Sequence, residues 1–315
     1  MAGAILIAVT GPSAADWIAR FRREAGRRDI RCWPDVGTPA DIAYACGWHP
    51  PPGAFAALPN LKAIFNLGAG VDAMLADPTL PAVPLVRAVH PDLTNRMVEY
   101  VLLHVLMHHR RQRLYDAQQR ARLWRGHPQP AAAAVAVGVM GLGAIGAAAA
   151  AALRAVGFRV AGWSRTPRRL PDIECFHGPD GLDAFLARTE ILVCLLPATP
   201  ETEGILNRAL FRKLKRDGAL GGAYLVNAGR GRSQSDADIL AALKEGTLAG
   251  ATLDVFATEP LPPDSPLWSH PGVTVTPHNA GDLDPDVLVA QVLAQIERHE
   301  QGLPLVHLVD RTRGY

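Results

Sequence analysis

The chain has 315 residues, of which 49% are hydrophobic and 20% are charged, and its formal net charge is +2. This length is enough for two domains of ordinary size. The near balance of charge argues against a nucleic-acid partner, which usually requires a strong basic excess, and gives no support for binding to a membrane surface. The four cysteines are scattered and form no Cys-x-x-Cys pair, so we expect no disulfide framework, no metal site and a cytoplasmic location.

In the N-terminal part, apolar runs of strand length alternate with helical patterns. Ala4–Val9 is predicted to be a strand and not a signal peptide, since it has no basic segment before it and no cleavage-site pattern after it. Ser13 is typical of a helix N-cap, and the helix is expected to end near Arg23. Further strands are predicted at Ile42–Cys46, Leu61–Leu67 and Val83–Val86. A long helix is predicted at Met97–Tyr115, followed by a linker at Trp124–Pro130.

A second series of strands and helices follows this linker. Strands are predicted at Val135–Met140, Phe158–Trp163, Ile191–Leu196, Ala223–Asn227, Ala251–Val255 and Val273–Thr276. Helices are predicted at Ile145–Val156, with Gly157 as its C-cap, and at Asp236–Glu245 and Asp286–Gln301. Alternation of this kind favours parallel sheets with helices on both faces. The fold class is therefore predicted to be α/β, with two doubly wound parallel-sheet domains.

The strand at Val135–Met140 leads into Gly141-Leu142-Gly143-Ala144-Ile145-Gly146, a G-x-G-x-x-G sequence that opens a helix. In this context the first glycine allows the tight turn, the second lets the backbone approach a pyrophosphate, and the third brings helix and strand together. The helix N-terminus then faces the phosphate charge. The alternative is a glycine-rich turn that binds no ligand.

The next strand is followed by Ser164-Arg165-Thr166, with Arg168 and Arg169 just beyond. Enzymes that use NAD place a carboxylate near this position, where it binds the ribose hydroxyls. Here an arginine stands instead, and a guanidinium suits a 2′-phosphate. We therefore expect NADPH as the cofactor, with NADH as a possible second cofactor; the alternative is an ordinary solvated basic patch.

Three polar residues follow strands of the second series: Arg230, Glu259 and His278. Ligands of an open α/β sheet bind beyond the carboxyl ends of its strands, so the three side chains are placed to converge there. Taken singly, each has an ordinary interpretation as surface charge, loop residue or capping histidine. Together, after a dinucleotide turn, they indicate a site for hydride transfer.

The sequence resembles the D-isomer-specific 2-hydroxyacid dehydrogenase family, and is especially similar to its glyoxylate/hydroxypyruvate reductase A branch. The resemblance spans essentially the whole chain and rests on several segments in the family's order: Leu67–Asp72, Met97–Tyr100, Gly141–Gly146, Leu196–Thr202, Asn227–Gly231, Asp254–Pro260 and Val309–Tyr315. It implies a flavodoxin-like substrate domain at residues 1–97 and 285–315. It also implies a Rossmann dinucleotide-binding domain at residues 98–284. Asn279 is a departure, because the family more often has an apolar residue after the histidine.

The resemblance also implies roles for the three polar residues. His278 would be the general acid, and Glu259 would hold it protonated, because a nearby carboxylate favours the charged imidazole. Arg230 would bind the carboxylate of the 2-oxo acid and polarise its carbonyl. The turn Leu67-Gly68-Ala69-Gly70 would bind the substrate, and the backbone N–H groups of Gly68, Ala69 and Gly70 would complete the carboxylate site. Trp48 either borders the substrate or has a plain packing role.

Asp254 would orient the nicotinamide end of the cofactor, and Thr199 is a candidate for lining the cofactor cleft. The other expected cofactor contacts in this part of the chain are Leu196, Pro197, Thr202, Ala228, Gly229, Arg230, His278 and Ala280. The expected reaction is reduction of a small 2-oxo acid such as glyoxylate or hydroxypyruvate, by a homodimer. Two alternatives stay open: a dehydrogenase for a different or bulkier acid, and a nucleotide-sensing protein of the co-repressor type.

Overall fold

The computed structural model describes residues 3–10 and 14–314, and the predicted N-cap Ser13 lies outside them. Contacts between Cα atoms divide the chain into two compact units. Unit 1 comprises Met1–Leu93 and Leu283–Tyr315, and unit 2 comprises Thr94–Asp282. The boundaries predicted from the sequence are residues 97 and 285. Within the described part of the chain, no helix is both long enough and apolar enough to cross a lipid bilayer.

Unit 1 contains a five-stranded sheet in which all strands are parallel and the order is β2-β1-β3-β4-β5. Its strands are β1 (Ala4–Val9), β2 (Ile30–Cys32), β3 (Ile42–Trp48), β4 (Ala63–Asn66) and β5 (Leu85–Val86). This is the flavodoxin-like strand order, so the prediction for this domain is confirmed. The central strands β1, β3 and β4 are almost wholly buried, as expected for a parallel sheet that is covered on both faces.

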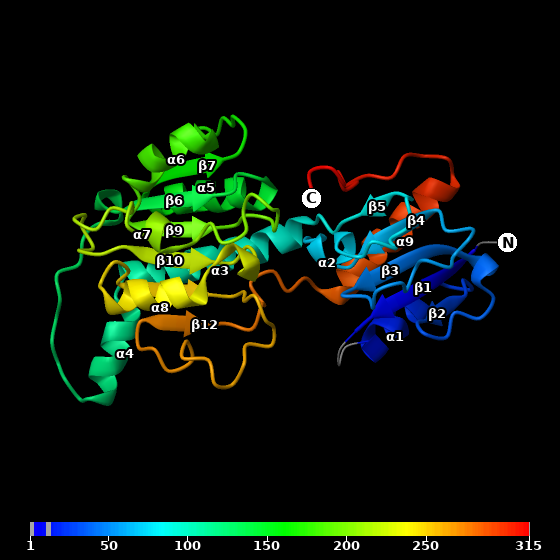
Figure 1. Cartoon of the computed structure of the whole chain (residues 1–315), viewed down its shortest axis with the longest axis horizontal. Helices are drawn as coiled ribbons and strands as arrows, with labels where there is room; N and C mark the ends of the chain where they lie inside the picture. Colours follow the sequence, from blue (N-terminus) through cyan, green and yellow to red (C-terminus); the bar gives the residue numbers. More distant parts are fainter. Residues whose placement is uncertain (1–2, 11–13, 315) are drawn as a thin grey trace. The chain divides into compact units, whose positions relative to one another are not determined.

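Helices from the two ends of the chain cover this sheet together. The helices and 3₁₀ turn of unit 1 are α1 (Ala14–Glu24), η1 (Pro39–Asp41), α2 (Asp72–Leu75) and α9 (Pro285–Glu300). α9 buries Leu288, Val292 and Ile296 in the same apolar cluster as Ile5 and Phe65. Figure 1 shows α9, in orange, lying against the strands of unit 1. The C-terminal helix α9 thus packs on the sheet that the N-terminal strands form.

Unit 2 contains a seven-stranded parallel sheet of order β12-β11-β10-β9-β6-β7-β8. Its strands are β6 (Ala136–Met140), β7 (Arg159–Ser164), β8 (Glu174–His177), β9 (Ile191–Cys194), β10 (Tyr224–Asn227), β11 (Gly250–Leu253) and β12 (Val273–Val275). Counted from β6, this is the Rossmann order 3-2-1-4-5-6 with one further strand. The predicted doubly wound fold is confirmed. The order reverses between β6 and β9, where such sheets bind their ligands.

Helices lie on both faces of the unit 2 sheet, with α8 drawn in front of it and α3 behind it in Figure 1. The helices and 3₁₀ turns that reach this unit are α3 (Pro91–His109), α4 (Gln112–Arg120), η2 (Ala132–Ala134), α5 (Ala144–Val156), α6 (Gly178–Leu186), α7 (Arg208–Phe211), η3 (Gly231–Ser233) and α8 (Asp236–Lys244). After α4 the chain runs outside the sheet and its helices until η2 (Figure 1).

The predicted helical segment Met97–Tyr115 is confirmed except at residues 110 and 111, where it divides into two helices. α3 begins six residues earlier at Pro91, and the helical path breaks at Arg111, which has a left-handed backbone with φ 57°. Tertiary contacts accompany the break: His108 Nε2 lies 3.0 Å from Thr252 Oγ1, and Gln129 donates to the His109 carbonyl at 2.9 Å. The local hydrophobic pattern that predicts a helix carries no information on contacts with residues so distant in sequence.

Candidate active site

The glycine-rich turn joins β6 to α5. Gly141 has φ 101°, and its N–H donates to the Trp163 carbonyl at 2.8 Å. A Cβ on Gly141 would lie 2.8 Å from the Leu195 carbonyl oxygen, and one on Gly146 would lie 1.8 Å from the Gly141 carbonyl oxygen. A Cβ on Gly143 would have no neighbour within 4 Å. The fold therefore requires the first and third glycines, whereas at Gly143 it leaves the backbone open to a phosphate group at the start of α5.

The arginine-rich segment begins where β7 ends. Ser164 is buried, and its hydroxyl donates to the Thr166 carbonyl at 2.8 Å. Arg165, Arg168 and Arg169 follow, and all three are exposed. Guanidinium groups thus stand beyond the strand next to β6, where a carboxylate would stand in an enzyme that uses NAD. These residues fit a cofactor with an additional phosphate.

Arg230 follows β10 in a loop that is held from beneath by Asn227, a fully buried residue. The Asn227 Oδ1 accepts the N–H of Gly229 at 3.1 Å, and its Nδ2 donates to the Arg230 carbonyl at 3.3 Å. The Arg230 guanidinium donates to the Gly229 carbonyl at 2.7 Å. A Cβ on Gly231 would lie 1.9 Å from the backbone carbon of Phe256. These contacts fix the loop while the Arg230 side chain stays partly exposed.

His278 and Glu259 are hydrogen-bonded, and His278 Nδ1 lies 2.7 Å from Glu259 Oε2. The second oxygen, Oε1, accepts the Phe256 N–H at 2.8 Å. Burial raises the pKa of the Glu259 carboxyl, but the bonds from His278 and Phe256 and the charges of His278 and Arg230 outweigh it. The pKa therefore lies below its usual value. Because the carboxylate occupies Nδ1, the Nε2 atom of His278 is the nitrogen available to a ligand.

Asp254 is almost fully buried just after β11, and it holds the loop that carries His278. Its Oδ1 accepts from the Thr276 hydroxyl at 2.6 Å and from the Asn279 N–H at 3.0 Å. Its Oδ2 accepts the Ala280 N–H at 3.0 Å, and its backbone carbonyl accepts the His278 N–H at 2.9 Å. Asp254 thus holds the loop that carries His278, and its expected contact with nicotinamide stays a prediction.

The segment after β9 is closed on itself by Thr202. The Thr202 hydroxyl donates to the Pro197 carbonyl at 2.7 Å and accepts the Thr199 N–H at 2.9 Å. The backbone of Leu196 packs against the loop of Gly229, where a Cβ on Gly229 would lie 2.7 Å from the Leu196 carbonyl oxygen. The hydroxyl of Thr202 therefore has partners inside its own turn, and the predicted cofactor contacts of this segment stay predictions.

In unit 1, the predicted substrate turn follows β4. Asn66, which is buried, donates to the carbonyls of Gly68 and Gly70 at 2.7 and 2.8 Å. A Cβ on Gly68 would lie 2.0 Å from the Trp48 ring, so the indole packs on this glycine. Within residues 3–10 and 14–314, the N–H groups of Ala69 and Gly70 donate to no other group. The packing role of Trp48 is therefore present, and the turn keeps backbone donors for an anion.

The structure thus gathers Arg230, Glu259, His278 and Asp254 at the carboxyl edge of the unit 2 sheet, while Trp48 and Leu67–Gly70 belong to unit 1. Sequence reasoning missed two residues that hold the loops, Asn66 and Asn227. Each is the last residue of its strand and is buried. A polar residue ending an apolar run was the signal that could have found them, because buried amides require hydrogen-bond partners.

Comparison with known proteins identifies the family. A model of the D-isomer specific 2-hydroxyacid dehydrogenase NAD binding domain matches residues 102–280. The chain is 42% identical over 309 residues to glyoxylate/hydroxypyruvate reductase A of Yersinia enterocolitica, and the match covers 96% of each protein. The chain belongs to the D-isomer specific 2-hydroxyacid dehydrogenase family.

Solved structures of family members resemble the whole chain. An NADPH-dependent glyoxylate/hydroxypyruvate reductase from Sinorhizobium meliloti, in complex with NADP and sulfate, shares 45% identity with a TM-score of 0.93. That match covers 99% of this chain and 100% of the other. A probable 2-hydroxyacid dehydrogenase from Rhizobium etli CFN 42, in complex with NADP, HEPES and L(+)-tartaric acid, shares 44% identity with a TM-score of 0.94 and full coverage of both chains.

The glycine geometry predicts two different outcomes for two alanine substitutions. Gly143→Ala adds a methyl group that meets no atom of the chain, so the melting temperature should stay near that of the wild type. The methyl group would occupy the space of the cofactor phosphate, and the Kd for NADPH should rise about tenfold, or roughly 1.4 kcal/mol. Fluorescence titration and thermal unfolding measure the two quantities.

Gly146→Ala is the matched control, because its new Cβ would collide with the Gly141 carbonyl oxygen. This variant should lose stability whether or not the cofactor is present. An unchanged NADPH affinity in a well-folded Gly143→Ala variant would show that the cofactor does not approach this turn.

Proposed function

We propose that this protein reduces a small 2-oxo acid of the glyoxylate or hydroxypyruvate type to the D-2-hydroxy acid, with NADPH as reductant. The observation that carries the proposal is the His278–Glu259 pair, 2.7 Å apart and electrostatically coupled to Arg230 at the carboxyl edge of a dinucleotide-type sheet. The names of relatives at 40–42% identity, glyoxylate/hydroxypyruvate reductase A, support the substrate class. NADP or NADPH in three related structures supports the cofactor.

We assign the cofactor to unit 2 and the substrate domain to unit 1. The turn Gly141–Gly146 would receive the pyrophosphate, and Ser164, Arg165, Thr166 and Arg168 would receive the 2′-phosphate. The remaining proposed cofactor contacts are Leu196, Pro197, Thr202, Ala228, Gly229, Arg230, Asp254, His278 and Ala280. Bound NADPH supplies the hydride.

The protein's own side chains provide the rest of the chemistry. Arg230 binds the substrate carboxylate and draws charge from the carbonyl oxygen. In unit 1, we propose the N–H groups of Gly68, Ala69 and Gly70 as donors to an anion. His278 gives the proton at Nε2 to the carbonyl oxygen, because Nδ1 is held by Glu259. The lowered pKa of Glu259 keeps the carboxylate charged, which stabilises the imidazolium before the proton leaves.

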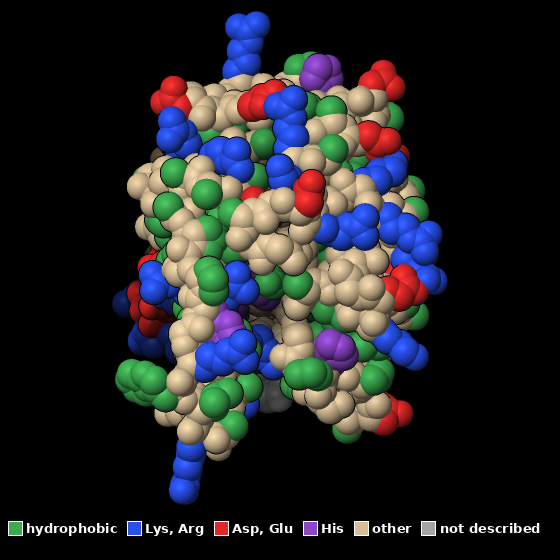
Figure 2. Space-filling view, turned by 90° about the vertical axis from the view of Figure 1, so that its left-hand side faces the viewer, with side chains coloured by type: hydrophobic (Ala, Val, Ile, Leu, Met, Phe, Trp, Pro, Cys, Tyr) green, Lys and Arg blue, Asp and Glu red, His purple; other side chains and the backbone are tan. Residues whose placement is uncertain are grey.

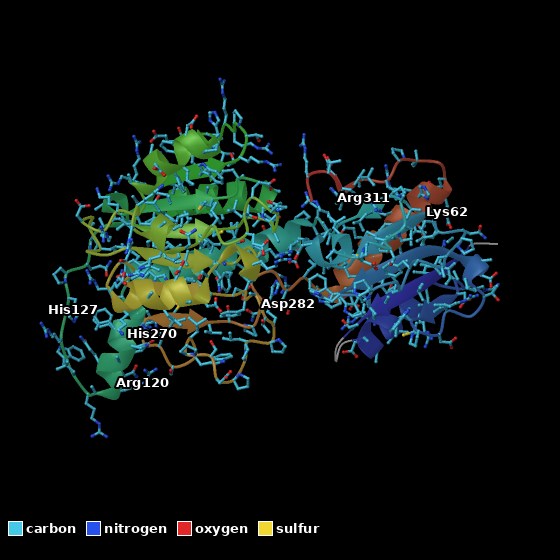
Figure 3. The ribbon with its side chains drawn as sticks, in the orientation of Figure 1. Lys62, Arg120, His127, His270, Asp282 and Arg311 are labelled. Atoms are coloured by element: carbon cyan, nitrogen blue, oxygen red, sulfur yellow. The ribbon has the colours of Figure 1, made fainter. Side chains whose placement is uncertain are left out.

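We further propose that the protein is a homodimer in which unit 2 pairs with unit 2. Trp124, in the segment after α4, is fully exposed, with a relative accessibility of 103%, and Leu123 beside it is 52% exposed. An exposed tryptophan leaves a large apolar area in water, and tryptophan and arginine are enriched in interfaces. Figure 2 shows apolar and basic side chains side by side on the end of unit 2 where Figure 3 labels Arg120 and His127.

A cytoplasmic location is proposed on the basis of the cysteines. Cys46 and Cys194 are buried, and Cys32 and Cys175 are partly buried; all four are free thiols. Burial raises the pKa of Cys46 and Cys194, which keeps both in the unreactive thiol form. Free thiols of this kind persist in a reducing compartment.

The proposed reaction is tested by a panel of 2-oxo acids, from glyoxylate to bulky branched acids, assayed with NADPH and NADH. The expected result is highest kcat/KM for a small acid with NADPH. His278→Ala should lower kcat by about 10²–10⁴-fold, because the general acid is lost, while the Kd of NADPH changes little. Turnover confined to bulky acids would contradict the substrate class. Tight NADPH binding without turnover of any acid would favour a sensor.

The cofactor preference has its own test in Arg165→Ala. Loss of a charged hydrogen bond to the 2′-phosphate should lower kcat/KM for NADPH by roughly 10- to 100-fold, while the value for NADH stays unchanged. Arg169→Ala is the matched control, since it removes an exposed arginine of the same segment that is not assigned to the phosphate. Equal losses with both cofactors, or equal effects of the two variants, would contradict the assignment.

The dimer is tested by Trp124→Arg, measured by light scattering after size-exclusion chromatography. A charged residue cannot be buried in the interface without a partner, so the variant should be monomeric at micromolar concentration. Leu303→Arg, which changes an exposed apolar residue of unit 1, should stay dimeric. A dimeric Trp124→Arg variant, or a monomeric wild type, would refute this interface.

A further inference from the structure

The backbone at His278 adopts a left-handed conformation with φ 53°, which few residues other than glycine adopt. The His278 imidazole is 32% exposed, and its Nδ1 is held by Glu259. The turn is maintained by Asp254, which accepts the N–H groups of His278, Asn279 and Ala280. The position of the general acid therefore depends on the position of the Asp254 carboxylate.

Two hydroxyl groups, those of Thr276 and Tyr100, continue the hydrogen bonding from the Asp254 carboxylate into the interior. Thr276 Oγ1 lies 2.6 Å from Asp254 Oδ1, and the Tyr100 hydroxyl lies 2.7 Å from Thr276 Oγ1. A carboxylate only accepts hydrogen bonds, so the Thr276 proton is directed at Asp254. The Tyr100 hydroxyl must then be the donor to Thr276. The hydrogen bonds therefore run in one direction, with Tyr100 donating to Thr276 and Thr276 donating to Asp254. This hydrogen-bond chain joins helix α3 to the loop of His278.

The surroundings of Tyr100 keep its proton in this chain. Tyr100 is only 9% exposed, and its ring packs on that of His104 with centroids 4.2 Å apart. Burial raises the pKa of the Tyr100 phenol; the bond to Thr276 opposes the rise and the charge of Asp254 adds to it. Burial also lowers the pKa of His104, although the charge of Asp254 acts in the opposite direction. A protonated tyrosine beside a neutral histidine remains a donor.

We propose that Tyr100 and Thr276 are positioning residues for the reaction. Through Asp254 they fix the turn that presents Nε2 of His278 to the carbonyl oxygen, without touching substrate. The proposal rests on the proposed function, because it assigns His278 the proton transfer. A positioning role differs from a role in folding because the hydrogen-bond chain holds only the turn of His278. Arg230, which would bind the substrate carboxylate, stands on a separate loop.

Thr276→Val removes the hydroxyl at constant shape and is the principal test. It should lower kcat roughly 10- to 100-fold, the range of a lost hydrogen bond to a charged group, while the KM of the 2-oxo acid stays within about twofold of the wild-type value. Thr276→Ser keeps the hydroxyl and should restore kcat. Tyr100→Phe, which removes the donor behind Thr276, should lower kcat about three- to tenfold.

Thr252→Val is the matched control. Thr252 is buried on β11, and its hydroxyl bonds His108 and not Asp254. This variant loses a buried hydroxyl and some thermal stability, but its kcat should equal that of the wild type. Equal kcat in Thr276→Val and wild type, equal losses of kcat in the Thr252 and Thr276 variants, or failure of Thr276→Ser to restore kcat would each overturn the proposal.

Hydrogen exchange separates this proposal from the proposed function. In Thr276→Val the amides of Asn279 and Ala280 should exchange faster than in the wild type, because Asp254 loses an anchor; in Thr252→Val they should not. If the wild type reduces no 2-oxo acid, the function fails, and this measurement still tests the hydroxyl chain. If the wild type is active and amide exchange is unaffected in Thr276→Val, the positioning proposal is refuted and the proposed function stands.

Discussion

Four loops meet so closely at the carboxyl edge of the seven-stranded sheet that side chains are excluded between them. A Cβ on Gly141 would lie 2.8 Å from the Leu195 carbonyl oxygen, and one on Gly229 would lie 2.7 Å from that of Leu196. The Gly231 position meets the backbone of Phe256 more closely still. Parallel strands force these loops to leave at the same edge, and glycine lets them pack backbone to backbone. Arg230, Glu259 and His278 extend from a surface that is rigid for this reason.

Buried polar residues at strand ends complete this rigidity. Asn66 ends β4, Asn227 ends β10, and Asp254 directly follows β11; none is more than 4% exposed. Each binds backbone groups of the loop that follows it or of a neighbouring loop. An unsatisfied amide in such a place would cost about 1–3 kcal/mol and a carboxylate more, so the loop geometry and the buried group depend on each other. The same arrangement recurs in both units, although the His278–Glu259 pair belongs to unit 2.

Much of the fold could be predicted because its signals are local. The apolar run Ala4–Val9 is a strand with the predicted bounds, and Gly157 is the left-handed C-cap of α5. The edge strand β8 was missed because its residues, Glu174–His177, contain no apolar run. In the site, Arg230 and His278 could be found from residue type and order. The Tyr100–Thr276 bond could not, because it joins residues 176 positions apart and no local pattern encodes it.

The exposed His278–Glu259 pair and the buried residues behind it differ in how much their hydrogen bonds contribute to stability. His278 and Glu259 are each about one third exposed, and a pair so exposed adds little to folding stability. Its 2.7 Å geometry and the lowered pKa of Glu259 fit the proton transfer that is proposed for His278. Tyr100 and Asp254 are buried, and for them stability and function depend on the same hydrogen bonds. Substitution of a buried anchor thus confounds the two effects unless a hydroxyl of equal burial is removed elsewhere, and Thr252 offers that comparison on the same strand that leads into Asp254.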